Sequence, residues 1–168
     1  MENKTEAWLT GPIDGVPPLL QPVAHALTQA NDEIHAIMQE FPQHKLWEKP
    51  ADLASVAFHL QHIPGVLDRL FSYSQGMQIS NAQLKYLSEE GLEDAALTKE
   101  MLLKNLSDRI GRSIDHLRTV DPETLLEERT VGRKKLPSTV LGLLFHAAEH
   151  TMRHTGQLLV TARLLIFT

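Results

Sequence analysis

Residues 138–165, STVLGLLFHAAEHTMRHTGQLLVTARLL, are the most informative part of this chain. Apolar residues recur there at three- and four-residue spacing, which predicts one long amphipathic helix. Within it, His146, His150 and His154 follow one another at four-residue steps. A four-residue step keeps side chains on one face of a helix, and histidine is the commonest metal ligand. The stretch therefore predicts a helix that contributes two imidazoles to one cation.

Helix geometry favours His150 and His154 as that pair. At about 100° per residue, His154 lies inside the apolar sector that would face a core, and His150 lies at its edge. The apolar members of this sector are Val140, Leu143, Ala147, Leu158 and Leu165. His146 turns the other way, toward Glu149 and Arg153, and is expected to be a flanking group. Two imidazoles buried side by side are costly unless something binds both, so a metal is the favoured interpretation.

Three further long helices are expected before this one. The paired prolines Pro17 and Pro18 suit a helix start, Pro64 should kink the second helix, and Ser138 is the expected N-cap of the last. The predicted helices span about 17–40, 52–73, 98–118 and 138–165, with a short helix at about 82–89. No segment shows sustained strand alternation. We therefore expect an all-α four-helix bundle, one domain over residues 1–168, with an extra short helix between helices two and three.

Composition excludes several other classes of protein. A net charge of −5 leaves no broad basic face for nucleic acid. The chain contains no cysteine, so disulfides and thiolate metal sites are excluded. No apolar stretch reaches the roughly 18 residues that a membrane span needs, and the polar N-terminus lacks a signal core. The expected location is the cytoplasm.

A second apolar stripe lies nearly opposite the core-facing sector of the last helix. It consists of Leu141, Phe145, Ala148, Met152 and Leu159. A helix that is apolar on two sides must be covered on two sides. The stripe predicts a homodimer contact, or, as a comparable alternative, burial beneath loops of the same chain.

The third metal ligand can be sought on the second predicted helix, which carries His59 and His62. Three residues apart, these side chains lie on neighbouring parts of one face. His59 is closer to the apolar centre of that helix, and His62 is at its edge next to Pro64. Helix geometry alone leaves both candidates open.

The chain resembles the DinB/YfiT-like superfamily of metal-dependent enzymes. The resemblance rests on SVAFHLQHIPG at 55–65 and on HAAEHTMRHTGQL at 146–158. It implies a four-helix bundle, usually dimeric, with one histidine on helix two and a His-x-x-x-His pair before Gly-Gln on helix four. Placed on this sequence, that pattern selects His62, His150 and His154 as the metal ligands. His59 and His146 are additional histidines that depart from the simplest pattern.

Three imidazoles suit a divalent ion such as zinc, nickel or iron. Three protein ligands leave coordination positions free, which is typical of catalytic sites. The resemblance implies a hydrolase or a thiol-dependent transferase acting on a small molecule, with a low-molecular-weight thiol as a possible substrate. Glu149 and Asp68 are the nearest carboxylates by spacing, although both point away from the inward histidines, and Gln157 is a candidate to orient a ligand. The alternative is a stress-related bundle without turnover, in which the metal is structural.

Overall fold

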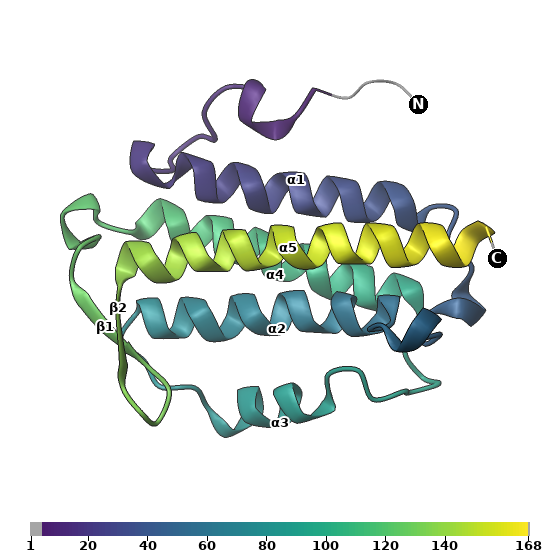
Figure 1. Ribbon diagram of the computed structural model, residues 1–168. Helices are drawn as coiled ribbons and strands as arrows, with labels where there is room; N and C mark the ends of the chain where they lie inside the picture. The colour runs from purple at the N-terminus through teal and green to yellow at the C-terminus, as the bar shows by residue number, and fades with distance from the viewer. Residues whose placement is uncertain (1–4, 168) are drawn as a thin grey trace.

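Four long helices and one short helix form the protein. The computed structural model describes residues 5–167, and its helices are α1 (Gln21–Met38), α2 (Val56–Ser74), α3 (Asn81–Glu89), α4 (Lys99–Thr119) and α5 (Val140–Phe167). α1, α2, α4 and α5 lie side by side as a bundle, whereas α3 lies outside it along α2 (Figure 1). The predicted all-α bundle with an extra short helix between its second and third long helices is confirmed.

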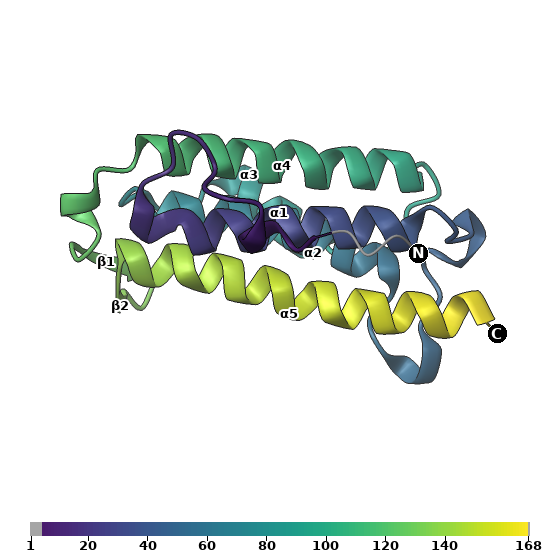
Figure 2. The same cartoon turned by 90° about the horizontal axis from the view of Figure 1, so that it is seen from above.

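The order of packing places α5 between α1 and α2. α5 contacts both of these helices, and α4 covers the far side of the same pair. Seen from above, α4 and α5 lie on opposite sides of α1 and α2 (Figure 2). α2 and α4 run in the same direction, so residues 75–98 carry the chain back along the bundle (Figure 1). This crossover is the segment that contains α3.

Side-chain caps account for the starts of α2, α3 and α4. The hydroxyl of Ser55 accepts a hydrogen bond from Phe58 N, and that of Thr98 accepts one from Met101 N. Ser80 and Gln83 form a reciprocal capping box at α3. α2 therefore begins at Val56, four residues later than the expected start near Asp52, because residues 50–52 form a separate 3-10 turn.

A two-stranded hairpin precedes α5, and the expectation of no strands was wrong here. β1 (Glu128–Val131) pairs in antiparallel register with β2 (Leu136–Thr139). Each strand has only four residues, too few for an alternating pattern to stand out. The cap of α5 is Thr139, the last residue of β2, and not the expected Ser138, because the Oγ1 of Thr139 accepts a hydrogen bond from Gly142 N at 3.0 Å.

The core runs through all four long helices. Among its fully buried side chains are Leu27, Ile34, Leu60, Leu67, Leu106 and Leu144. The second apolar stripe of α5 is only partly available at the surface, since Ala148 is buried and Leu141 packs against the core, while Phe145 is 64% exposed. None of the described helices is both long and apolar enough to cross a membrane.

Candidate metal centre

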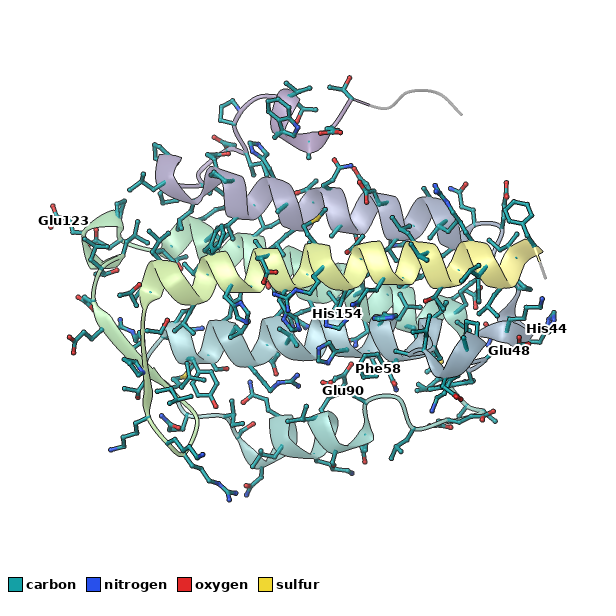
Figure 3. The ribbon with its side chains drawn as sticks, viewed as in Figure 1. His44, Glu48, Phe58, Glu90, Glu123 and His154 are labelled. Atoms are coloured by element: carbon teal, nitrogen blue, oxygen red, sulfur yellow. The ribbon has the colours of Figure 1, made fainter. Side chains whose placement is uncertain are left out.

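Three histidines from two helices converge midway along the bundle. His62 comes from α2, and His150 and His154 come from successive turns of α5. One ring nitrogen from each lies within 4.8 Å of the others, and His62 Nε2 is 3.0 Å from His150 Nε2. Figure 3 shows His154 in the space between α5 and α2. The two adjacent helices thus bring together the residues that the resemblance selects, in positions suited to hold a divalent metal ion.

Burial keeps the rings of His150 and His154 neutral. Loss of hydration, followed by repulsion from His62, lowers the pKa of His150 to about 4 and that of His154 to about 3. A neutral imidazole presents a nitrogen lone pair, which is the form that binds metals. Near neutral pH, α5 therefore offers two uncharged imidazoles to a metal ion.

The hydrogen bonds of His62 and His150 test whether these residues fit a metal. His62 Nδ1 lies 2.6 Å from the carboxylate of Glu90, which can only accept, so Nδ1 carries the proton and Nε2 has a free lone pair. This lone pair faces His150 Nε2, while His150 Nδ1 is buried without a hydrogen-bond partner among residues 5–167. With protein groups alone, one nitrogen of His150 stays unsatisfied in either tautomer. A cation accepted by both Nε2 atoms suits this donor set.

Glu90 is the residue of the site that sequence reasoning missed. Its side chain is only 3% exposed, and its second oxygen lies 2.6 Å from Arg69 Nη1. Glu90 directly follows α3, so it reaches His62 only because the crossover runs along α2. No periodicity or spacing in the sequence connects the two residues.

His59 lies next to the metal centre, against the ring of His154. It is 3% exposed, and its Nδ1 lies 3.0 Å from His154 Nδ1, one ring nitrogen beside another. Burial, and then repulsion from His62, lowers the pKa of His59 to about 4. The ring of Phe58 stacks on His62 with centroids 5.0 Å apart, at an interplanar angle of 15°. These two side chains form a wall that restricts the rings of His154 and His62.

The flanking candidates on α5 and α2 have polar partners of their own, although the ring of His146 also packs edge-on against that of His150 with centroids 5.3 Å apart. His146 is half-exposed and lies 3.4 Å from Glu149, which also binds Arg153 one turn further along α5. The hydrogen bond from Arg153 lowers the pKa of the exposed Glu149 carboxyl. Asp68 pairs with Arg109 on α4 at 2.6 Å. With both carboxylates engaged by arginines, neither contacts the three histidines in this structure.

A pocket of about 480 Å³ lies beside the histidines along α5, and we call it the α5 pocket. Gln157 lines this pocket. The remaining lining residues are Leu53, Ala54, His59, Arg153, Gly156, Val160 and Thr161. His59 lines the pocket and also contacts His154, with the two Nδ1 atoms 3.0 Å apart. The pocket is therefore adjacent to the metal centre.

Comparison with known proteins agrees with this architecture. The chain matches the family model described as the DinB superfamily over residues 3–158. No curated protein sequence matches it. A crystal structure described as a conserved protein from Enterococcus faecalis has 20% sequence identity and a TM-score of 0.69, covering 89% of this chain and 98% of that chain. At this identity, the similarity is one of fold.

Proposed function

Because the chain belongs to the DinB superfamily and gathers three histidines at one point, we propose that it is a metal-dependent enzyme whose ligands are His62, His150 and His154. The observation that carries the proposal is the convergence of one ring nitrogen each from His62 on α2 and from His150 and His154 on α5. Zinc, nickel and iron all suit such ligands, and each would supply Lewis acidity with open coordination positions. The reaction classes that we propose are hydrolysis of a small ester or amide and transfer of a group to a low-molecular-weight thiol.

The surroundings of the histidines favour a catalytic ion over a structural one. The hydrophobic core extends along all four long helices, so the bundle does not depend on three side chains near its middle. His59, the nearest additional histidine, lies against Nδ1 of His154. It therefore contacts a ligand ring, and it is not one of the three histidines whose nitrogens converge.

The α5 pocket is the proposed substrate site. Apolar groups of Leu53 and Val160 suit a largely apolar small molecule, and Arg153 and Gln157 place polar groups at its side. His59 connects this pocket to His154. A substrate in the α5 pocket would contact His59, and His59 could therefore orient it beside the metal centre.

Metal analysis with matched variants tests the ligand assignment. Purified wild-type protein should retain one divalent ion per chain, and His150→Ala should lose it because two ligands bind far more weakly than three. His146→Ala is the control, since this histidine lies four residues away on the same helix but is half-exposed and flanking. Retention of the metal by His150→Ala would overturn the assignment. Unfolding of the wild type upon chelation would instead assign the metal a structural role.

A substrate screen tests the enzymatic part of the proposal. Activated esters, and thiol-plus-electrophile pairs, should reveal turnover that chelation abolishes. Val160→Trp should fill the α5 pocket and suppress this turnover without loss of metal. Phe145→Trp, a large substitution on an exposed part of α5 that does not line the pocket, should leave it unchanged. Metal-dependent turnover that persists in Val160→Trp would exclude the pocket as the substrate site.

We further propose a homodimer that uses the outward face of α5. Phe145 and Phe167 are exposed there, at 64% and 86%. Light scattering of the wild type should give twice the monomer mass, and Phe145→Glu should weaken the dimer by placing a charge in an apolar contact. A monomeric wild type would contradict this proposal.

A further inference from the structure

We propose that Glu90 is a positioning residue for the metal centre. In this inference, which rests on the proposed function, Glu90 fixes both the orientation of the His62 ring and the nitrogen that carries its proton. Residues 81–91, which are part of the crossover, bring this carboxylate to His62. In this inference α3 affects the metal centre by positioning Glu90, although α3 itself contributes no metal ligand.

The two oxygens of Glu90 have different partners. Oε2 lies 2.6 Å from His62 Nδ1, and Oε1 lies 2.6 Å from Arg69 Nη1. Figure 3 shows Glu90 between α3 and α2. A carboxylate that is only 3% exposed is costly unless it is paired, and Arg69 supplies the compensating charge. The pair with Arg69 alone would fasten the segment, but the second oxygen is bound to a proposed metal ligand.

The contact with His62 determines which nitrogen can bind a metal. An ionised carboxylate accepts hydrogen bonds and donates none. It therefore holds the His62 proton on Nδ1 and leaves the lone pair of Nε2 directed at His150 Nε2, 3.0 Å away. Carboxylates that hold metal-ligating histidines in this way typically strengthen metal binding by about 10–100-fold.

The residue that precedes His62 anchors the crossover segment. The side-chain oxygen of Gln61 accepts a hydrogen bond from Gly91 N at 2.7 Å, and its backbone oxygen accepts one from the Tyr86 hydroxyl at 2.9 Å. Gln61 is itself buried. These contacts hold the chain on both sides of Glu90, so the position of the carboxylate is defined by α2, the helix that also carries His62.

Gly65 provides the space that Glu90 occupies. A Cβ at this position would lie 2.2 Å from Glu90 Oε1 and 2.9 Å from Arg69 Nη1. Glycine inside a helix costs about 1 kcal/mol relative to alanine, so its presence one turn after His62 needs a reason. The close approach of the Glu90 carboxylate to the helix supplies that reason.

The isosteric variant Glu90→Gln tests the inference sharply. Its amide oxygen can accept from Arg69 while its NH2 donates to His62 Nδ1, so the packing and both hydrogen bonds can persist. The donor now faces Nδ1, however, which moves the His62 proton to Nε2 and blocks the lone pair. Nitrogen NMR of the metal-free protein should show Nδ1–H in the wild type and Nε2–H in the variant.

Zinc affinity, measured by competition with a chromophoric chelator, is the second readout. Glu90→Gln should bind zinc about 10–100-fold more weakly than the wild type. Glu89→Gln, which removes the adjacent but exposed carboxylate, should stay within about twofold. Gly65→Ala should also weaken zinc binding, because it displaces Glu90 without altering any proposed ligand.

The outcomes separate this inference from the proposed function. An unchanged His62 tautomer and unchanged zinc affinity in Glu90→Gln would overturn the positioning role. A wild type that binds no metal would overturn the proposed function, and the tautomer of the metal-free protein would still test the link between Glu90 and His62. If Glu90→Gln does not fold, Gly65→Ala with unchanged zinc affinity would also overturn the inference.

Discussion

The metal-free protein should lose stability steeply as the pH falls below about 6.5. His59, His150 and His154 have pKa values of about 4, 4 and 3 in the folded protein, mainly because burial disfavours the charged imidazolium. In the unfolded chain the same groups have the ordinary histidine pKa of 6.5. Between these pH values the unfolded chain binds protons that the folded chain does not. Stability is therefore full above pH 6.5 and falls as the pH decreases toward the folded values.

The size of the effect follows from the number of protons taken up on unfolding. Near pH 5 each of the three histidines takes up close to one proton when the chain unfolds. One proton changes the free energy of unfolding by a little over roughly 1 kcal/mol per pH unit. Three protons give about 4 kcal/mol per pH unit as the contribution of these three histidines, which is large beside a total stability of about 5–15 kcal/mol.

Urea unfolding followed by circular dichroism measures this slope directly. The metal-free protein should be titrated with urea at several values between about pH 7 and pH 5. His154→Gln should reduce the proton uptake near pH 5 by about one. His146→Gln, which removes a half-exposed ring on the same helix, should leave the slope unchanged. A wild-type uptake of less than one proton near pH 5 would refute the argument that these imidazoles are buried in the neutral form.

Three other outcomes can be checked by standard unfolding measurements. Thr139→Ala should lower the free energy of unfolding by about 1 kcal/mol through loss of the α5 cap, whereas Ser138→Ala should have a smaller effect. If urea titrations showed the larger loss for Ser138→Ala, Ser138 would be the cap. Leu144→Ala should cost about 2–5 kcal/mol because it leaves a cavity in a fully buried position, and Val160→Ala, at an exposed position, should cost well under half as much. Zinc at a hundredfold excess over its Kd should stabilise the metal-free protein by about 2.7 kcal/mol, which corresponds to a rise in Tm of roughly 5–11 °C; an unchanged Tm by scanning calorimetry would contradict metal binding to the folded state.

The helices were predictable because their signals are local. Apolar spacing located α1, α2, α4 and α5, and the short α3 was expected within a residue of where it lies. The hairpin at 128–139 was missed because its four-residue strands are stabilised by pairing with each other. The start of α2 was placed too early because residues 50–52 form a separate turn, in which Ala51 has a left-handed conformation (φ 49°) that cannot continue into the right-handed helix.

The choice of the third ligand between the two histidines on α2 could not be made from the sequence of that helix alone. His59 and His62 are three residues apart, and periodicity left both available as the third ligand. In the structure, His62 Nε2 faces His150 Nε2 and His62 belongs to the converging group, whereas His59 Nδ1 lies beside Nδ1 of His154. This difference depends on how α2 and α5 pack, and a pattern within one helix does not contain it.

What the sequence determined alone is the set of helices and the pairing of His150 with His154, because both follow from 3.6 residues per turn within one element. Only the tertiary structure decided which groups lie near that pair. These are His62 Nε2, the Glu90 carboxylate and the α5 pocket beside His59. These belong to other segments of the chain, and their distances from α5 depend on helix packing and on the path of the crossover. The local sequence determines which face of a helix a side chain occupies, whereas the fold determines which residues of other segments contact that face.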